Sequence, residues 1–397
     1  MPKCMRRIRV GIVCDLLSER WPSMDLVGDM LLQRLASGHG AAIEAVRLRP
    51  DEGGASRGAA GGAGSATRMF RRYWSYRCWL ARRRDAADVF HVVDHSYAHL
   101  VHVLPPGRAI VTCHDTDAFR PLIVPGQRES RLPRAVVRHV ARGLARAAVV
   151  TCDSQATRAD LVSSGLARAE RLVVVPMGVH PSCTAAPEAG ADSEASRMLD
   201  DPRTRSPISP DQNDMQRPLD LLHVGSTIPR KRIDVLLRVV AAVRADWPSA
   251  RLVRVGGSFT AAQQRMAEDL GVAPHIVSLP FLERRVLAAV YRRAALVLLP
   301  SEREGFGLPV VEAMACGTPV VASDLPVLRE VGGDAASYCP PGDVVAWRET
   351  IRSLLQERCS GSPEWQRRIS CGLAQAAKFS WDRCAGEMAK LYCEIVG

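Results

Sequence analysis

Short hydrophobic runs recur along the first half of the chain, and longer segments with helical spacing separate them. Each run is rich in Val and Ile, as expected of parallel strands that are covered on both faces. The runs occupy residues 9–14, 87–93, 109–113, 148–152 and 171–175. Helical spacing is found at residues 25–35 and 134–146. This alternation predicts βαβ units and a doubly wound parallel sheet.

The same alternation resumes in the second half, after residue 218. Strands are predicted at residues 220–224, 250–255, 275–279, 295–299 and 319–322. Helices are predicted at residues 232–244, 284–294 and 309–316. No sequence repeat relates the two halves. The predicted fold class is therefore α/β, with two Rossmann-like doubly wound domains.

Two stretches interrupt the pattern. Residues 51–67 are rich in Gly, Ala and Ser and predict a mobile loop. Residues 184–218 are rich in Pro, Asp and Ser, and they predict a linker with a disordered insertion. A chain of 397 residues suits two domains of roughly 150–200 residues each. We predict an N-terminal domain over 1–182, a linker over 183–218 and a C-terminal domain over 219–376.

The composition indicates a cytoplasmic globular protein. Hydrophobic residues make up 47% of the chain and charged residues 24%. No apolar run approaches the roughly 20 residues that span a bilayer. The first apolar stretch is short and is broken by Asp15, which favours a buried strand over a signal peptide. The 12 cysteines form no C-x-x-C pair, so we predict reduced thiols and no zinc site.

The positive charge of the chain lies entirely in its first half. Residues 1–182 hold 27 Lys and Arg against 16 Asp and Glu, whereas residues 183–397 hold 26 of each. The excess of +11 predicts an acidic partner for the first half, either an anionic membrane surface or a phosphorylated acceptor. The alternative is that these arginines only solvate the surface.

Residues 68–84 (RMFRRYWSYRCWLARRR) combine arginines with aromatic residues. Such a segment could lie at a membrane interface, with its arginines on anionic lipid. It could equally be an amphipathic helix that packs its aromatic side chains inward. Stacking on nucleic acid is the third alternative, but nothing else in the chain resembles a nucleic-acid-binding module. No nucleic-acid partner is therefore predicted.

The strongest candidate for chemistry is the segment 300–324 (PSEREGFGLPVVEAMACGTPVVASD). It begins at the carboxyl end of a predicted strand, where open α/β sheets bind ligands. A glycine-rich turn, Gly305-Phe306-Gly307, then opens a helix and lets the backbone approach a phosphate. Two carboxylates, Glu304 and Glu312, flank this turn, and the hydroxyls of a sugar and a ribose would give each of them a partner.

A second motif, His223-Val-Gly-Ser-Thr-Ile-Pro-Arg-Lys231, follows the first strand of the second half. Gly225 lies in the turn, and Arg230 and Lys231 lie at the start of a helix. Two adjacent cations at this end oppose the helix dipole unless an anion is also bound. A diphosphate would resolve the conflict.

His114 ends a first-half strand in the segment Val111-Thr-Cys-His-Asp115. Because it follows a strand end, it is a candidate functional side chain on the N-terminal domain. Asp115-Thr-Asp117 also spells D-x-D, a metal-binding motif of some sugar transferases. Because Arg230, Lys231 and a helix N-terminus already supply positive charge for a phosphate, we predict no metal.

Together these motifs resemble glycosyltransferase family 4, whose members are retaining enzymes of the GT-B fold with an E-x7-E motif. The resemblance implies that Glu304 lies near the donor sugar, Glu312 binds the ribose, and Arg230 and Lys231 hold the pyrophosphate. It also implies a catalytic role for His114, which is similar to the histidine on the N-terminal side of the family's cleft. Further similarity is found at residues 151–161, 175–179 and 379–381. It implies two domains that face a cleft, with a C-terminal helix over 377–397 that crosses back to the first domain.

The family resemblance implies a hexosyltransferase that uses a UDP- or GDP-sugar without a further cofactor. The acceptor would be a glycan or a lipid-linked glycan, in bacterial cell-surface polysaccharide or glycolipid synthesis, at the inner face of the membrane. The candidate site comprises His114, Gly225, Arg230, Lys231, Glu304, Gly305, Phe306, Gly307, Leu308 and Glu312. The family's Gly-rich loop after the first strand is absent, because residues 21–28 contain one glycine. A non-catalytic nucleotide-sugar-binding subunit of a membrane-associated complex therefore remains the alternative.

Overall fold

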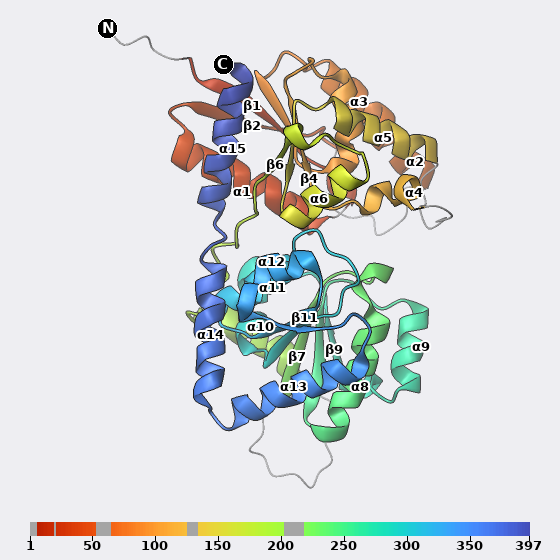
Figure 1. The fold of residues 1–397 in the computed structure, drawn as a ribbon, viewed down its shortest axis with the longest axis vertical. Coiled ribbons are helices and arrows are strands. Elements are labelled where there is room, and N and C mark those ends of the chain that lie inside the picture. The colour runs from red at the N-terminus through yellow and green to blue at the C-terminus, as the bar shows by residue number, and fades with distance from the viewer. Residues whose placement is uncertain (1–5, 20, 53–64, 125–133, 202–217) are drawn as a thin grey trace. The chain divides into compact units, whose positions relative to one another are not determined.

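The computed structural model describes residues 1–397 except 1–5, 20, 53–64, 125–133 and 202–217. The chain forms two compact units (Figure 1). Unit 1 comprises Met1–Gly178 and Ser380–Gly397, and unit 2 comprises Val179–Phe379. The chain therefore returns to unit 1 at its C-terminal end.

Unit 1 is built on a parallel six-stranded sheet with the order β2-β1-β3-β4-β5-β6. Its strands are β1 (Ile8–Val13), β2 (Ile43–Leu48), β3 (Val89–Val92), β4 (Ala109–Cys113), β5 (Val149–Cys152) and β6 (Leu172–Val174). The order reverses between β1 and β3, which makes this the switch point of the sheet. A ligand of unit 1 is expected outside the carboxyl ends of these two strands.

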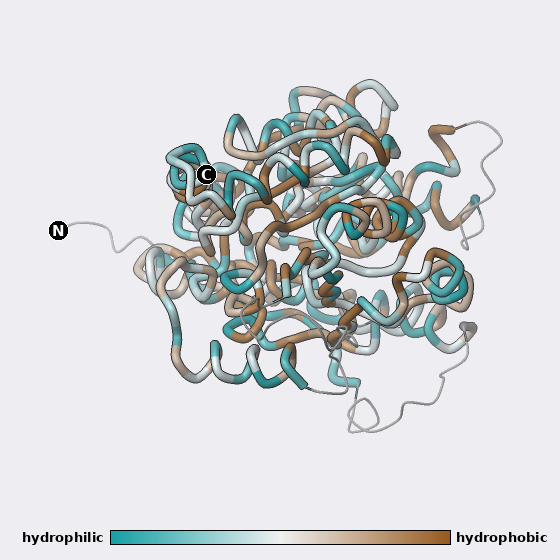
Figure 2. The backbone as a smooth tube through the Cα atoms, turned by 90° about the horizontal axis from the view of Figure 1, so that it is seen from below, coloured by the Kyte–Doolittle hydropathy of each residue, from teal (hydrophilic) through white to brown (hydrophobic). Residues whose placement is uncertain are grey.

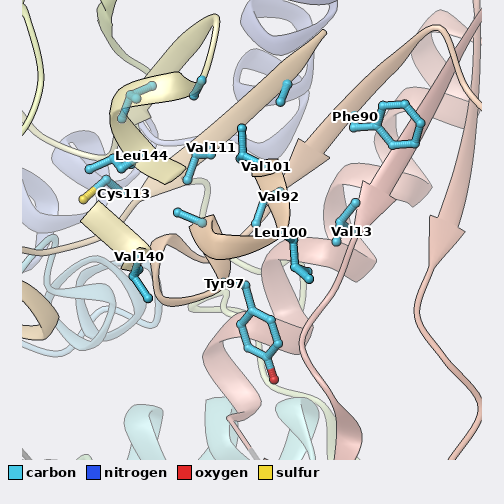
Figure 3. Close-up of a cluster of buried hydrophobic side chains, with 14 of the residues drawn as sticks. Val13, Phe90, Val92, Tyr97, Leu100, Val101, Val111, Cys113, Val140 and Leu144 are labelled. Carbon is cyan, nitrogen blue, oxygen red and sulfur yellow. The ribbon is translucent and has the colours of Figure 1, made fainter. Parts of the chain in front are cut away.

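Helices cover both faces of this sheet (Figure 1). The helices are α1 (Pro22–His39), α2 (Ser65–Phe70), α3 (Tyr76–Ala81), α4 (Arg120–Ile123), α5 (Arg134–Arg146), α6 (Gln155–Ser163) and α15 (Trp381–Val396). Helix α15 packs on α1, and α5 packs on the 3-10 segment η4 (His95–Val103). Figure 3 shows the apolar core, in which buried strand residues such as Val92 and Val111 lie near Leu144 of α5. The predicted return of the C-terminal helix to the first domain is confirmed.

A buried chain of hydrogen bonds attaches α15 to the sheet of unit 1. The Tyr392 hydroxyl lies 2.7 Å from Nδ1 of His91, and Nε2 of His91 lies 2.7 Å from the Thr112 hydroxyl. The Thr112 hydroxyl lies 2.8 Å from that of Thr151. Burial lowers the pKa of His91 to about 3, so its ring is neutral and can donate at one nitrogen and accept at the other.

Unit 2 contains a second parallel six-stranded sheet with the order β12-β11-β10-β7-β8-β9. Its strands are β7 (Leu219–Val224), β8 (Ala250–Val255), β9 (Ile276–Leu279), β10 (Leu296–Leu299), β11 (Val320–Ser323) and β12 (Ser337–Cys339). Counted within the unit, this is the dinucleotide-fold order 3-2-1-4-5-6. The switch point lies between β7 and β10.

Helices pack around this sheet. They are α7 (Ala189–Asp200), α8 (Ile233–Asp246), α9 (Ala261–Asp269), α10 (Arg284–Arg293), α11 (Leu308–Ala315), α12 (Pro326–Gly332), α13 (Val344–Cys359) and α14 (Pro363–Ala376). Of these, α7 packs on α10, and α14 packs on α11. Figure 2 shows that hydrophilic and hydrophobic residues are interspersed along the coiled segments of the chain. The buried sides of α8 and α13 meet in a core that contains Leu236, Trp347 and Ile351. None of the helices in the described ranges is long and apolar enough to cross a membrane.

Helix α7 corrects the prediction of a disordered insertion over 183–218. The helix buries a narrow stripe of small or apolar residues, Ala191, Ala195 and Leu199, at a spacing of four. Two ion pairs to α10 complete its attachment: Arg292–Asp192 and Arg293–Asp200, both at 2.6 Å. The polar appearance of the segment reflects these pairs. The rest of that predicted insertion, residues 202–217, lies outside the described residues, as does most of the predicted loop, residues 53–64.

Residues 68–84 form a helical segment with two kinds of surface. Tyr76 and Leu80 are buried, which agrees with the inward-packing alternative. Arg72 also points inward and lies 2.9 Å from Glu19. In contrast, Phe70 and Trp74 are 58% and 61% exposed, one helical turn apart. The segment thus packs its centre and presents two aromatic rings to the outside.

Candidate functional site

The second motif and the E-x7-E segment meet at the switch point of the second sheet. Gly225 follows β7, and residues 300–304 follow β10, the strand that pairs with β7. Open α/β sheets bind ligands outside the carboxyl ends of strands at such a point. The topology therefore brings together two motifs that are about 75 residues apart in the sequence.

Glu304 lies at the centre of this site and binds both predicted cations. The Lys231 Nζ lies 2.6 Å from Glu304 Oε1, and Arg230 lies 3.4 Å from Oε2. The Ser301 hydroxyl donates a third hydrogen bond of 2.6 Å. The side chains of Lys231, Arg230 and Glu304 are 12%, 18% and 6% exposed, so these charges are not solvated surface groups.

Burial alone would raise the pKa of Glu304, but the charges of Lys231 and Arg230 outweigh it and lower the pKa. The carboxylate is therefore ionised near neutral pH. One negative charge faces two positive charges here, which leaves a net positive site beside the glycine turn. Such a site attracts an anion.

Backbone contacts fix Arg230 relative to the loop after β10. The amide of Glu302 donates to the Arg230 carbonyl at 2.8 Å, and the Arg230 guanidinium donates to the Arg303 carbonyl at 3.1 Å. The next residue, Arg232, has a left-handed φ of 49°, the only positive φ of a non-glycine residue in the described part of the chain. Asp234 holds its side chain with hydrogen bonds of 3.0 and 2.9 Å. Backbone strain of this kind persists where the surroundings impose it, often at binding sites.

The glycine-rich turn opens helix α11 as predicted. Gly307 has φ 96° at the helix N-cap, and a Cβ there would lie 2.7 Å from Leu328 Cδ2, so both conformation and space favour glycine. Leu308 is the first residue of the helix. The Phe306 ring is 3% exposed and packs against Phe379 with ring centroids 5.5 Å apart. If Phe306 contacts the sugar nucleotide, the contact must therefore come from its backbone.

Glu312 lies on α11, and its partners differ from those of Glu304. Its Oε2 accepts a 2.9 Å hydrogen bond from the Tyr291 hydroxyl, and Oε1 lies 3.6 Å from Arg284. Burial raises the pKa of Glu312, and the charge of Arg284 offsets part of this rise. Within the described residues, no hydrogen bond or ion pair joins it to Lys231, Arg230 or Glu304.

His114 lies at the carboxyl end of β4 in unit 1, and protein groups occupy both of its ring nitrogens. Nδ1 is 2.6 Å from Asp153, and Nε2 is 2.7 Å from the Val93 carbonyl. Both partners only accept, so the ring donates twice and carries a proton on each nitrogen. Burial alone would lower the pKa of His114, but the charge and hydrogen bond of Asp153 raise it to about 9. This geometry favours a fixed cation, and the catalytic role of His114 stays a prediction.

Three acidic residues beside His114 were not identified from the sequence. Asp15 follows β1, Asp94 follows β3 and Asp153 follows β5, so all three lie along the same edge of the sheet as His114. Asp94 is ionised: burial would raise its pKa, but His95, Arg72 and His114 lower it to about 2. Burial and the neighbouring Asp94 raise the pKa of Asp15 well above its ordinary value. The sequence does contain a signal for these three residues, because each directly follows one of the hydrophobic runs that predict strands.

Comparison with known families agrees with the motifs. The profile of Glycosyl transferases group 1 matches residues 205–370, and that of Glycosyltransferase Family 4 matches residues 40–182. The first match contains Gly225, Lys231, Glu304 and Glu312, and the second contains His114. The chain belongs to the family 4-like glycosyltransferases.

A curated relative of this family 4-like chain is the D-inositol 3-phosphate glycosyltransferase of Mycobacterium leprae. The two are 35% identical over 193 residues, which are 45% of this chain and 43% of that protein. The chain spans less than half of the length of the first such relatives that it matches. The similarity therefore supports the family and leaves the substrates open.

Solved structures of glycosyltransferases share the fold over nearly the whole chain. Sucrose-phosphate synthase from Thermosynechococcus elongatus matches with a TM-score of 0.70 and 18% identity, over 98% of this chain and 99% of that one. HepE of Anabaena, in complex with UDP and glucose, matches with a TM-score of 0.70 and 15% identity, over 98% and 100%. At these identities the likeness shows the fold alone, and it confirms the predicted GT-B class of this family 4-like chain.

Proposed function

We propose that this protein is a retaining glycosyltransferase that moves a hexose-type sugar from a nucleoside diphosphate to a glycan or lipid-linked acceptor. The observation that carries the proposal is the convergence of Lys231 and Arg230 on Glu304 at the switch point of unit 2. HepE, which has the same fold, is named as binding UDP-glucose, and this supports a sugar nucleotide as the donor.

The leaving group of such a transfer is a nucleoside diphosphate, on which negative charge develops. Lys231 and Arg230 would stabilise that charge, because both are held in place before the donor binds. The backbone amides at the start of α11 would contribute in the same direction. No metal is required in this scheme to balance the diphosphate.

Glu304 and Glu312 would orient the donor. Glu304 keeps its charge through Lys231 and Arg230 and so can accept hydrogen bonds from sugar hydroxyls. Glu312, fixed by Tyr291 and Arg284, would accept from the ribose. Neither carboxylate is assigned as a nucleophile, because Glu304 is committed to two cations and a hydroxyl.

The function is tested with the purified protein and a panel of UDP-, GDP- and ADP-sugars. We expect one of them to be turned over, with or without added acceptor, and the anomeric configuration of the product to match the donor by NMR. Glu304→Ala should abolish turnover, and Glu387→Ala, at an exposed ion pair with Lys390, should not. If no sugar nucleotide binds and Glu304→Ala changes nothing, the proposal is wrong. Tight binding without turnover would favour the non-catalytic subunit.

We propose further that unit 1 meets a phosphorylated acceptor or the anionic inner face of the membrane. Residues 1–182, nearly all of which belong to unit 1, carry the charge excess of +11. Phe70 and Trp74 present exposed rings beside Arg71. The relative from Mycobacterium leprae is named for a phosphorylated compound, inositol 3-phosphate.

The membrane part of this proposal is tested with lipid vesicles. Vesicles with about 30% phosphatidylglycerol should bind the protein and pure phosphatidylcholine vesicles should not. Phe70→Ser with Trp74→Ser should weaken this binding, and equal binding to both vesicles would contradict the membrane part.

A further inference from the structure

Arg254 is a fully buried cation near the carboxyl end of strand β8. Its side chain has no exposed surface, and it makes no ion pair within the described residues. Burial lowers the pKa of Arg254 to about 10, which still leaves it charged at neutral pH. A buried charge without a carboxylate is costly, so its presence calls for an explanation.

The guanidinium of Arg254 binds the backbone carbonyls of three glycines. It donates to Gly225 at 2.9 Å, to Gly256 at 2.7 Å and to Gly257. Gly225 follows β7, and the other two follow β8, so the contacts join two strand ends at the edge where the candidate donor site lies. Gly256 and Gly257 have φ values of 110° and 80°, a conformation that other residues rarely adopt.

These contacts determine where the neighbouring amides point. In a trans peptide the carbonyl and the following N–H point in opposite directions, and no described peptide bond is cis. Because the three carbonyls face the guanidinium, the amides of Ser226, Gly257 and Ser258 face away from it. None of these amides donates a backbone hydrogen bond within the described residues. Gly257 and Ser258 supply two successive amides, which is the pattern of an anion-binding nest, and Ser226 adds a third amide from the neighbouring turn.

The charge balance of the site agrees with this arrangement. Gly225 connects Arg254 to Lys231, because a Cβ at Gly225 would lie 3.8 Å from Lys231 Cε. Burial lowers the pKa of His223, two residues before Gly225, to about 3, and the charges of Arg254 and Lys231 contribute to this shift. Three cations (Arg230, Lys231 and Arg254) against one carboxylate (Glu304) leave two positive charges in excess. A diphosphate carries the complementary charge.

We propose that Arg254 is a positioning residue for the donor diphosphate, which presets the amides of Ser226, Gly257 and Ser258 and supplies the third cation of the site. This inference rests on the proposed function and adds to it a residue that lies outside both sequence motifs. Arg254 acts through the glycine turns and has no exposed surface of its own for the ligand.

The test compares a nucleoside with its diphosphate by calorimetry. The wild type is first titrated with UDP, GDP and ADP, and the tightest ligand is used afterwards. In Arg254→Met, the Kd of the diphosphate should rise roughly tenfold or more, while that of the nucleoside stays unchanged. Arg254→Lys should restore part of the loss. The matched control is Arg251→Lys on the same strand, a buried arginine that is paired with Asp220 and should affect only stability.

Two results would overturn the proposal. Arg254→Met could lower the Tm yet bind the diphosphate as the wild type does, or it could lose affinity for nucleoside and diphosphate equally. Hydrogen exchange on the wild type provides a second measurement if the variant does not fold: saturating diphosphate should slow exchange at Ser226, Gly257 and Ser258, and unchanged exchange would contradict the nest. A wild type that binds no nucleoside diphosphate would instead refute the proposed function itself.

Discussion

At the scale of single residues, the candidate donor site combines one carboxylate, Glu304, with two cations that bind it directly and with Arg254, which is linked to them through Gly225. Glu304, Arg230 and Lys231 were predicted from their motifs and from the family resemblance, and the structure joins them by ion pairs. Arg254 was not predicted, because a charged residue inside a strand that reads ARLVRV gives no indication of its partners. Its role depends on three backbone carbonyls, which have no sequence signature.

Lys231→Met should reduce the rate of sugar transfer by about 100-fold or more. The substitution removes a preset charge that is most useful when the leaving diphosphate forms, so kcat should fall more than KM rises. Steady-state kinetics with the active sugar nucleotide measure this split. Lys390→Met, at an exposed ion pair on α15, is the matched control and should leave the rate unchanged. A loss confined to KM would assign Lys231 to binding alone.

The stability of unit 1 should depend on the charge of His114. The pKa of His114 is raised from 6.5 to about 9 in the folded protein, so the stabilisation is complete below 6.5 and is lost as the pH rises through about 9. Urea unfolding of the wild type and of His114→Gln measures the difference. The difference should be on the order of 3 kcal/mol near pH 6 and shrink towards pH 10. A difference that stays constant over this range would refute the fixed cation.

At the scale of secondary-structure elements, the sequence indicated all the strands with continuous apolar runs. It missed β2 and β12, which lie at sheet edges and carry polar residues such as Glu44, Arg47 and Ser337. It also missed α7, which is held by ion pairs to α10 and a narrow stripe of small side chains. Periodicity detects elements that bury a wide apolar face, and these three do not. The residue pattern also predicted no helix at α6, α9, α12, α13 or α14, although α13 buries Trp347, Ile351, Leu354 and Leu355 at helical spacing.

The docking of α15 should depend on the hydroxyl of Tyr392. Tyr392→Phe removes the partner of His91 Nδ1 in a fully buried place, which should cost about 1–3 kcal/mol of the free energy of unfolding. Urea unfolding followed by circular dichroism measures the change. Glu394→Gln, exposed on the same helix, should have no effect. If the urea midpoints of Tyr392→Phe and the wild type were equal, the Tyr392 hydroxyl would make no net contribution to the free energy of unfolding.

At the scale of the whole molecule, the donor should stabilise unit 2 alone. A ligand that binds only the folded state at 100 times its Kd adds about 2.7 kcal/mol to the free energy of unfolding. Hydrogen exchange with a saturating nucleoside diphosphate should therefore slow around Gly225–Lys231 and Ser301–Leu308, which form the site. Amides of the unit 1 sheet serve as the internal control. If protection were centred on His114, the nucleotide would bind unit 1, and the prediction would be contradicted.

The two connections between the units have a consequence for how the protein is made. The chain passes from one unit to the other after Gly178 and back after Phe379. Residues 179–379 are continuous and can fold while synthesis is still under way. Unit 1 emerges first from the ribosome but lacks the helix that covers its first strands until residues 380–397 follow. The half of the chain that is translated first is therefore the last to be completed. Until then, the part of its sheet that α15 will cover stays exposed to solvent.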